Sequence, residues 1–231
     1  AEYPGTGLGD QVKRLNKIMQ LNYECRKNNY MEEKGALLTP EELAELLETY
    51  DVISFDIFDT LLLRQVEKPT DVFSFMEAKY SLPRFCHLRM RAEAEARKKS
   101  PMGEVDLNDI YDLLEKWIGI DKALWMEREI EAEKKLCYAN PYMKILIEKL
   151  KAKQKRMIAV SDMYLKRDVI CDLLTFAGYD GIEEVFVSNE YQMSKGNGKL
   201  YDVRKKYVGN KRVIHIGDNI VSDYAGAKKQ G

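Results

Sequence analysis

Three short apolar runs in this chain are each followed at once by polar side chains that could carry chemistry. These polar residues are Asp56 after the run 52–55, Ser161 after 156–160, and Gly217-Asp218-Asn219 after 213–216. If the runs are strands of one open parallel sheet, their carboxyl ends border a single crevice. A carboxylate held there can attack an electrophile and form a covalent intermediate, which divides one difficult displacement into two easier ones. Asp56 is therefore the predicted nucleophile.

Two more carboxylates, Asp218 and Asp223, predict a cation at the same place. Mg²⁺ prefers hard oxygen ligands of this kind, and a phosphate and waters would complete its octahedron. Asp223 has a second interpretation, as a helix N-terminal charge that the macrodipole favours.

The remaining polar residues suit phosphoryl transfer. Ser161 can donate a hydrogen bond to a phosphoryl oxygen, and Lys195 can neutralise charge on the nucleophile and on the transferring group. Lys199 is the alternative cation, but it falls where a helix predicted over 199–207 should begin. We therefore assign this role to Lys195.

The order of these residues resembles a known family. Asp56, Ser161, Lys195 and Gly217-Asp218 are similar to the four motifs of the haloacid dehalogenase superfamily of aspartyl-nucleophile hydrolases. The resemblance covers roughly 52–231 in scattered pieces. It implies a Rossmann-like core, a cap that closes over the crevice, and catalysis at Asp56.

The resemblance also implies roles for individual residues. Asp56 and Asp218 would ligate Mg²⁺ together with the backbone carbonyl of Phe58. Asp223 would support this shell or bind the metal directly. We expect substrate contacts from three further residues: Thr60, Arg64 and Asp162.

One position departs from the family pattern. Phosphatases of this superfamily carry a second Asp two residues after the nucleophile, where it protonates the leaving oxygen and then activates water. This chain has Phe58 there. Asp59, the next residue, is either a substitute acid/base or a structural residue of the turn.

An aromatic residue at position 58 is also similar to the dehalogenase branch, whose Asp attacks carbon without a metal. That branch lacks a Gly-Asp pair followed by another Asp. The presence of Gly217, Asp218 and Asp223 therefore favours Mg²⁺-dependent hydrolysis of a small phosphorylated metabolite, of the phosphosugar or nucleotide class. A metal-independent 2-haloacid dehalogenase remains the alternative.

A third interpretation is a binding module with low turnover. The segment Phe55-Asp-Ile-Phe-Asp-Thr-Leu-Leu62 resembles modules found beside sugar transferases in bacterial surface-polysaccharide proteins. A sugar-transferase domain in the same full-length protein is the partner that this resemblance implies. Loss of a general acid predicts low turnover, because proton transfer typically contributes ~10² to 10⁴-fold to the rate.

The elements that must position these residues alternate between strand and helix, which predicts an α/β fold with right-handed parallel crossovers. The expected core comprises 51–64 and 156–231, with strands at 52–55, 156–160, 184–188 and 213–216. Residues 1–50 are predicted to form an N-terminal helical extension. One indication is an apolar stripe with helical spacing, formed by Val12, Leu15, Met19 and Tyr23. The other is a capping box at Thr39-Pro40-Glu41-Glu42.

The insert 65–155 shows no strand pattern and is predicted to be an all-helical cap, with helices at 70–80, 84–99, 107–117, 122–138 and 141–151. Asp106 and Asn140-Pro141 are N-cap signals. By resemblance, the cap expels water from the crevice. Arg89, Glu93 and Arg97 share one helical face and predict a solvated ion-pair stripe; alternatively, an arginine turns inward to bind an anionic substrate.

Composition excludes several classes. Lys and Arg number 37 against 38 Asp and Glu, without a long basic run, so we expect no nucleic-acid partner. The four Cys are scattered, which predicts reduced thiols and a cytoplasmic location. No stretch reaches the ~20 apolar residues needed to span a bilayer, so we expect no membrane association. The chain begins at Ala1 without Met and stops at Gly231 after a helical pattern, as an excised domain would.

Overall fold

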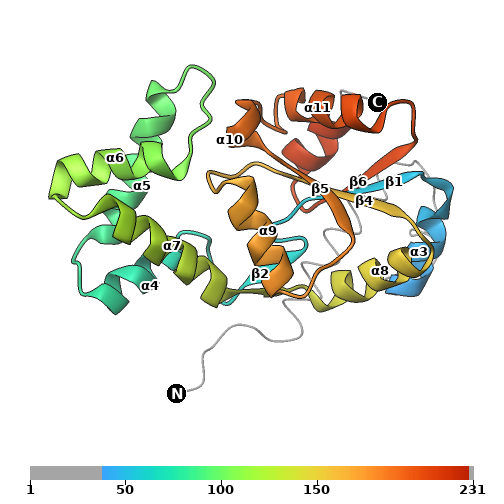
Figure 1. The fold of residues 1–231 in the computed structure, drawn as a ribbon, viewed down its shortest axis with the longest axis horizontal. Helices are drawn as coiled ribbons and strands as arrows, with labels where there is room; N and C mark the ends of the chain where they lie inside the picture. Colours follow the sequence, from blue (N-terminus) through green and yellow to red (C-terminus); the bar gives the residue numbers. More distant parts are fainter. Residues whose placement is uncertain (1–37, 229–231) are drawn as a thin grey trace.

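The computed structural model describes residues 38–228, and its centre is a four-stranded parallel sheet in the order β5-β4-β1-β6 (Figure 1). The strands are β1 (Val52–Phe55), β4 (Arg156–Ser161), β5 (Ile182–Val187) and β6 (Val213–Ile216). The four predicted strands and the α/β class are confirmed. Short runs of buried residues predict such strands well, because helices cover both faces of the sheet.

Each face of the sheet packs against its own set of helices. Ile53 and Phe55 share a core with three helices, α3 (Pro40–Leu46), α8 (Pro141–Ala152) and α9 (Arg167–Phe176). Val52 points to the opposite face, into a smaller core with α11 (Lys199–Val208). Three short helical segments complete the core: η1 (Leu47–Thr49), α10 (Ser188–Tyr191) and the π-helical η2 (Ile220–Gly226).

The predicted capping box before α3 is confirmed. Glu42 N donates to Thr39 Oγ1 at 3.2 Å, and Thr39 N donates to Glu42 Oε2 at 2.8 Å. These reciprocal bonds satisfy two backbone donors that a helix start otherwise leaves unpaired. The apolar stripe predicted over 12–23 lies outside the described residues.

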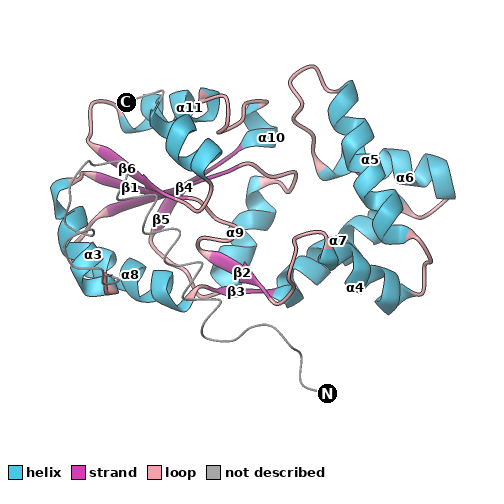
Figure 2. Ribbon diagram, turned by 180° about the vertical axis from the view of Figure 1, so that it is seen from behind, coloured by secondary structure: helices cyan, strands magenta, loops and turns pink. Residues whose placement is uncertain are grey.

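Four helices form a separate group beside the sheet domain (Figures 1 and 2). They are α4 (Asp71–Tyr80), α5 (Phe85–Lys99), α6 (Leu107–Ile118) and α7 (Lys122–Leu136). The predicted N-cap of α6 is confirmed, because Asp109 N donates to Asp106 Oδ1 at 3.0 Å. Within residues 38–228, no helix has both the length and the apolar character to cross a membrane.

The expectation of an insert without strands is wrong. β3 (Cys137–Ala139) pairs in antiparallel fashion with β2 (Leu62–Arg64), so the two chain segments that join the helical group to the sheet domain form a ribbon. Cys137 continues the apolar pattern of α7, but its backbone is extended, with φ −80° and ψ 144°. Pairing with β2 satisfies backbone groups that a longer helix would have bonded internally.

The helix α8 lies outside the four-helix group, although the predicted cap, 65–155, includes it. It packs against α3 beside the sheet (Figure 2). Asn140 precedes it as the predicted N-cap and also donates through Nδ2 to Thr60 O at 2.9 Å. The start of α8 is thus tied to the turn that follows β1.

Arg89 does not belong to a solvated stripe and is not available for a substrate. It is completely buried, with Nε and Nη2 each 2.7 Å from the carboxylate oxygens of Glu129. Glu93 accepts from Arg89 at 3.1 Å and from Arg97 at 3.0 Å. The predicted pairing of these three residues is therefore confirmed. The solvated character and the substrate role are corrected for Arg89, because a buried guanidinium needs the carboxylates of its own helical group.

Candidate active site

The chain turns sharply after β1 and places Asp56 at the carboxyl end of the sheet. Asp56 N donates to Ile216 O at 2.8 Å, which extends the pairing of β1 with β6 by one residue. The carboxylate of Asp56 is buried, and its Oδ2 lies 3.4 Å from Thr60 Oγ1. Thr60 is therefore buried beside the predicted nucleophile.

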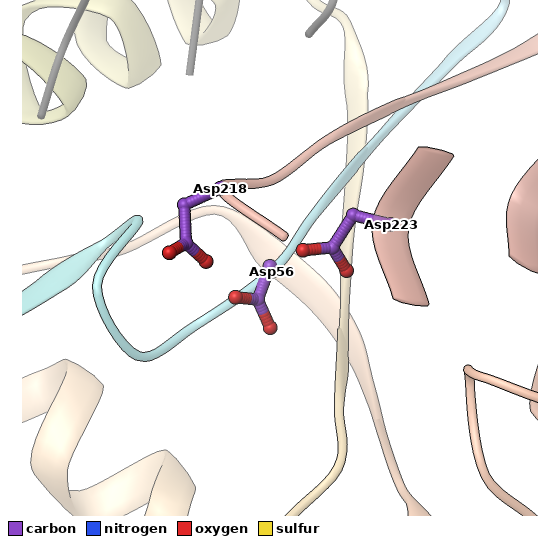
Figure 3. A group of neighbouring side chains, drawn as sticks. All are labelled: Asp56, Asp218 and Asp223. Atoms are coloured by element: carbon purple, nitrogen blue, oxygen red, sulfur yellow. The ribbon is translucent and has the colours of Figure 1, made fainter. Parts of the chain in front are cut away.

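Three carboxylates from different segments converge there (Figure 3). Oxygen atoms of Asp56, Asp218 and Asp223 lie within 4.8 Å of one another. Gly217 permits this approach, since a Cβ built on it would lie 2.4 Å from Asp223 Cγ. The cluster has the donor set that a small divalent cation takes from proteins.

Lys195 lies between two of these carboxylates. Its Nζ is 2.6 Å from Asp56 Oδ1 and 2.6 Å from Asp223 Oδ1. The backbone of Lys195 can pack this closely against Gly226 because glycine has no side chain. A Cβ on Gly226 would lie 2.2 Å from Lys195 O. Lys199, the competing cation, is exposed at the first residue of α11.

The surroundings of the cluster shift the pKa of Asp56 and the pKa of Asp223 in opposite directions. Burial, reinforced by the charges of Asp223 and Asp218, raises the pKa of Asp56 to about 8. Burial also disfavours the ionised form of Asp223, but Lys195 and His215 outweigh burial and hold the pKa of Asp223 below its usual range. The Lys195 ammonium contacts Asp56 and Asp223, and an additional cation beside the cluster would favour ionised Asp56.

Ser161 ends β4, the neighbour of β1, and Asp162 follows it. Ser161 is buried at the last position of the strand. The carboxylate of Asp162 accepts a hydrogen bond from Lys195 N at 2.8 Å. Asp162, predicted to bind substrate, therefore orients the loop that carries the lysine.

The structure gives Arg64 a different environment from the predicted one. The Arg64 guanidinium is buried, donates to both oxygens of Glu133 at 3.0 and 3.2 Å, and lies 4.3 Å from the centre of the Phe58 ring. An aromatic ring with a guanidinium against it thus occupies the position of the family's second Asp. We assign Arg64 to the ribbon that joins the two parts of the chain, since Glu133 lies in α7.

Asp59 is held in the same turn. It has a left-handed backbone, with φ 60°, and Asp59 N donates to Leu62 O at 2.8 Å. Its charge also contributes, after burial and other neighbours, to the raised pKa of the buried Cys137 thiol. The backbone of Asp59 therefore shapes the turn after β1.

Sequence reasoning missed two residues beneath the cluster. His215 Nε2 lies 3.1 Å from Asp223 Oδ1, and His215 Nδ1 lies 2.9 Å from Ser54 Oγ. Burial lowers the pKa of His215 to about 4, although Asp223 opposes the shift, so the ring is neutral. A signal was present in the sequence, since Ser54 and His215 are polar residues inside apolar strands, each two positions before a predicted motif.

No protein-family model and no curated protein matches this chain. Solved structures do match its fold. A magnesium-bound HAD-hydrolase, YfnB, from Bacillus subtilis is 16% identical, with 79% of this chain and 86% of that chain covered and a TM-score of 0.57.

Two further solved structures represent different chemistries. An L-2-haloacid dehalogenase from Xanthobacter autotrophicus, with chloropropionic acid covalently bound, is 17% identical over 79% of this chain and 75% of that chain, with a TM-score of 0.55. A HAD phosphatase from Thermococcus onnurineus is 16% identical over 78% of this chain and 83% of that chain, with a TM-score of 0.52. Together with the strand order and the helical insert, these matches show that the chain has the fold of the haloacid dehalogenase superfamily.

Proposed function

We propose that this protein is a Mg²⁺-dependent hydrolase that cleaves a small phosphate monoester through an aspartyl phosphate on Asp56. The observation that carries the proposal is the convergence of Asp56, Asp218 and Asp223 around Lys195. A phosphoryl group in transfer spreads negative charge over its oxygens, and catalysis depends mainly on positioning and charge neutralisation. A cation and Lys195, both beside the buried carboxylate of Asp56, would neutralise this negative charge.

The residues fit a magnesium ion. Asp56 and Asp218 would hold it, together with the Phe58 carbonyl that the family resemblance implies. Asp223 is better suited to orient the residues around the ion than to bind the ion itself, because its Oδ1 already accepts hydrogen bonds from Lys195 and His215. When bound, the ion would supply positive charge that favours the ionised nucleophile and neutralises the phosphoryl oxygens.

The reaction has two displacements at phosphorus. A carboxylate oxygen of Asp56 attacks the phosphorus atom, and the bond from phosphorus to the leaving oxygen breaks. Water then attacks the same phosphorus, and the bond to Asp56 breaks, which releases phosphate and restores the carboxylate. Lys195 Nζ, 2.6 Å from Asp56, is placed to stabilise charge in both steps.

Phe58 limits the substrates that react quickly. The first displacement produces an alkoxide or phenoxide that must be protonated. The side chain of Phe58 has no acidic group that could donate this proton. Ser161 would bind a phosphoryl oxygen but is too weak an acid to replace the missing carboxyl group. We therefore propose faster turnover for phosphate esters of acidic alcohols, including sugar 1-phosphates, than for simple alkyl phosphates.

A phosphatase panel tests the proposal. Sugar phosphates, nucleotides and phosphoserine are incubated with and without Mg²⁺, and released phosphate is measured. We expect phosphate release that requires Mg²⁺ and is abolished by Asp56→Asn. Asp172→Asn, at an exposed position of α9, is the matched control and should leave the rate unchanged.

Phe58 also favours a second candidate, a 2-haloacid dehalogenase in which Asp56 attacks carbon. Folds of this type include the dehalogenase from Xanthobacter autotrophicus. Chloride release from a 2-chloroacid, measured with a chelator present, separates the two functions. Chloride release without metal, combined with no phosphate release from the panel, would replace the phosphoryl proposal.

A further inference from the structure

A buried hydrogen-bonded chain runs from the sheet to the predicted nucleophile. Ser54 and His215 are register partners in the parallel pair of β1 and β6, so their side chains lie side by side on one face. That face packs against α11, whose Tyr201 ring meets the His215 ring edge-on with 5.1 Å between centroids. Asp56 follows Ser54 by two residues, on the same face.

The contacts in this chain are short and continuous. Ser54 Oγ lies 2.9 Å from His215 Nδ1, and His215 Nε2 lies 3.1 Å from Asp223 Oδ1. Asp223 Oδ1 in turn accepts from Lys195 Nζ at 2.6 Å, and the same Nζ bonds Asp56 at 2.6 Å. Ser54 and His215 are both buried.

The partners determine which nitrogen of His215 carries the proton. A carboxylate oxygen only accepts hydrogen bonds, so Nε2 beside Asp223 must be the protonated nitrogen. The neutral ring then has an unprotonated Nδ1, which accepts from the Ser54 hydroxyl. One tautomer satisfies both contacts, and the other leaves Nε2 and the Asp223 oxygen facing each other as two acceptors.

We propose that His215, with its tautomer set by Asp223 and accommodated by the Ser54 hydroxyl, is a positioning residue that holds Asp223 against Lys195 and so prepares the site for its cation. Asp223 has donors on both oxygens, because Asn219 N donates to Oδ2 at 3.0 Å. With His215 in place, the carboxylate has little freedom to rotate toward the metal or away from the lysine. The consequence for Mg²⁺ affinity rests on the proposed function; the tautomer does not.

The first test is the tautomer itself. The chain has two His, and His87 is exposed, so His87→Gln leaves only the signal of His215 in a long-range ¹H–¹⁵N NMR spectrum. We expect a protonated Nε2 and an unprotonated Nδ1 in the folded protein without metal. An unprotonated Nε2 would overturn the proposal, because His215 could then not donate to Asp223.

The second test separates positioning from packing. In His215→Gln the side-chain amide nitrogen reaches about as far as Nε2 and can still donate to Asp223, whereas in His215→Asn it reaches only the level of Nδ1. Mg²⁺ affinity is measured by calorimetry for both variants. We expect His215→Gln to stay near the wild-type affinity and His215→Asn to lose ~10-fold or more, as for other residues that orient metal ligands.

The possible results point to different conclusions. Equal losses in both variants would show that His215 acts only through packing and would contradict the proposal. If the wild type binds no Mg²⁺, the proposed function fails, while the NMR spectrum still decides whether His215 donates to Asp223. Ser54→Ala provides a variant that keeps the imidazole; we expect it to retain the protonated Nε2, because Asp223 still requires a donor.

Discussion

At the scale of single residues, the site depends on one ammonium group shared by two buried carboxylates. Lys195 lies 2.6 Å from both Asp56 and Asp223, and all three side chains are buried. Separating a buried ion from its partner leaves a charge with neither water nor a counter-ion. Lys195 therefore contributes to folding as well as to the proposed chemistry.

Replacement of Lys195 by Met should destabilise the protein strongly. Removing one partner from a buried ion pair typically costs ~3 kcal/mol or more, and here the buried, ionised Asp223 loses its ammonium partner. The free energy of unfolding is measured by urea titration without metal. Lys199→Met, at an exposed position, is the control and should change stability by less than about 0.5 kcal/mol. Similar small losses in both variants would contradict the buried pairing.

Asp59→Asn distinguishes a structural from a catalytic carboxylate. Asn tolerates the left-handed backbone of this position, so we expect unchanged stability and a small, uniform loss of activity across substrates. A loss of ~10²-fold or more, larger for poor leaving groups, would instead identify Asp59 as the displaced acid/base. Rates on an aryl phosphate and on an alkyl phosphate provide the measurement.

At the scale of elements, the β2–β3 ribbon is the connection between the four-helix group and the sheet domain. The ribbon is reinforced by the buried pair of Arg64 and Glu133. Its second strand leads into Asn140, which is bonded to the backbone of Thr60 and Leu61 beside the predicted nucleophile. A movement of the four-helix group would therefore displace the turn after β1.

Hydrogen exchange locates the hinge. If the helical group closes when orthovanadate and Mg²⁺ bind, exchange should slow at 62–64 and 137–139, because these strands connect the moving parts. Residues 153–155, at the end of the predicted cap, should not change, because α8 packs against α3. Changes at 153–155 without changes in the ribbon would contradict this placement of the hinge.

The elements and motifs were predictable where the signal is local. The four core strands are recognisable as short apolar runs. The motif residues that follow them, such as Asp56 and Asp218, are recognisable by their spacing along the sequence. β3 was missed because Cys137 continues a helical pattern and only its pairing with β2 makes it a strand. The contact of Ser54 with His215 was missed because it depends on the register of two strands distant in sequence.

At the scale of the whole molecule, the four-helix group is in contact with the sheet domain at more than the ribbon. Tyr164, in the loop after β4, lies with its ring 4.7 Å from the buried guanidinium of Arg89. Lys166, which precedes α9, has its Nζ 3.7 Å from Oδ2 of Asp106 at the start of α6. These contacts link the helical group to the segment that follows the carboxyl end of β4, as a cap that excludes water would require.

Magnesium should stabilise the whole fold. A ligand that binds only the native state adds RT ln(1 + [L]/Kd), or ~2.7 kcal/mol at 100 times Kd, and here it also relieves repulsion among three carboxylates. We expect millimolar Mg²⁺ to raise the melting temperature and Asp218→Asn to remove most of that shift. NaCl at equal ionic strength is the control. A melting curve unchanged by Mg²⁺ would count against the metal site.

The most direct test of the central claim is to trap the intermediate. The protein is mixed with a reactive phosphate monoester and Mg²⁺, quenched in acid, and digested for mass spectrometry. We predict one added phosphoryl group on the peptide that contains Asp56, absent without Mg²⁺ and absent in Asp56→Asn. Phosphate release with no phosphoryl group on Asp56, or with the group on another residue, would contradict the account.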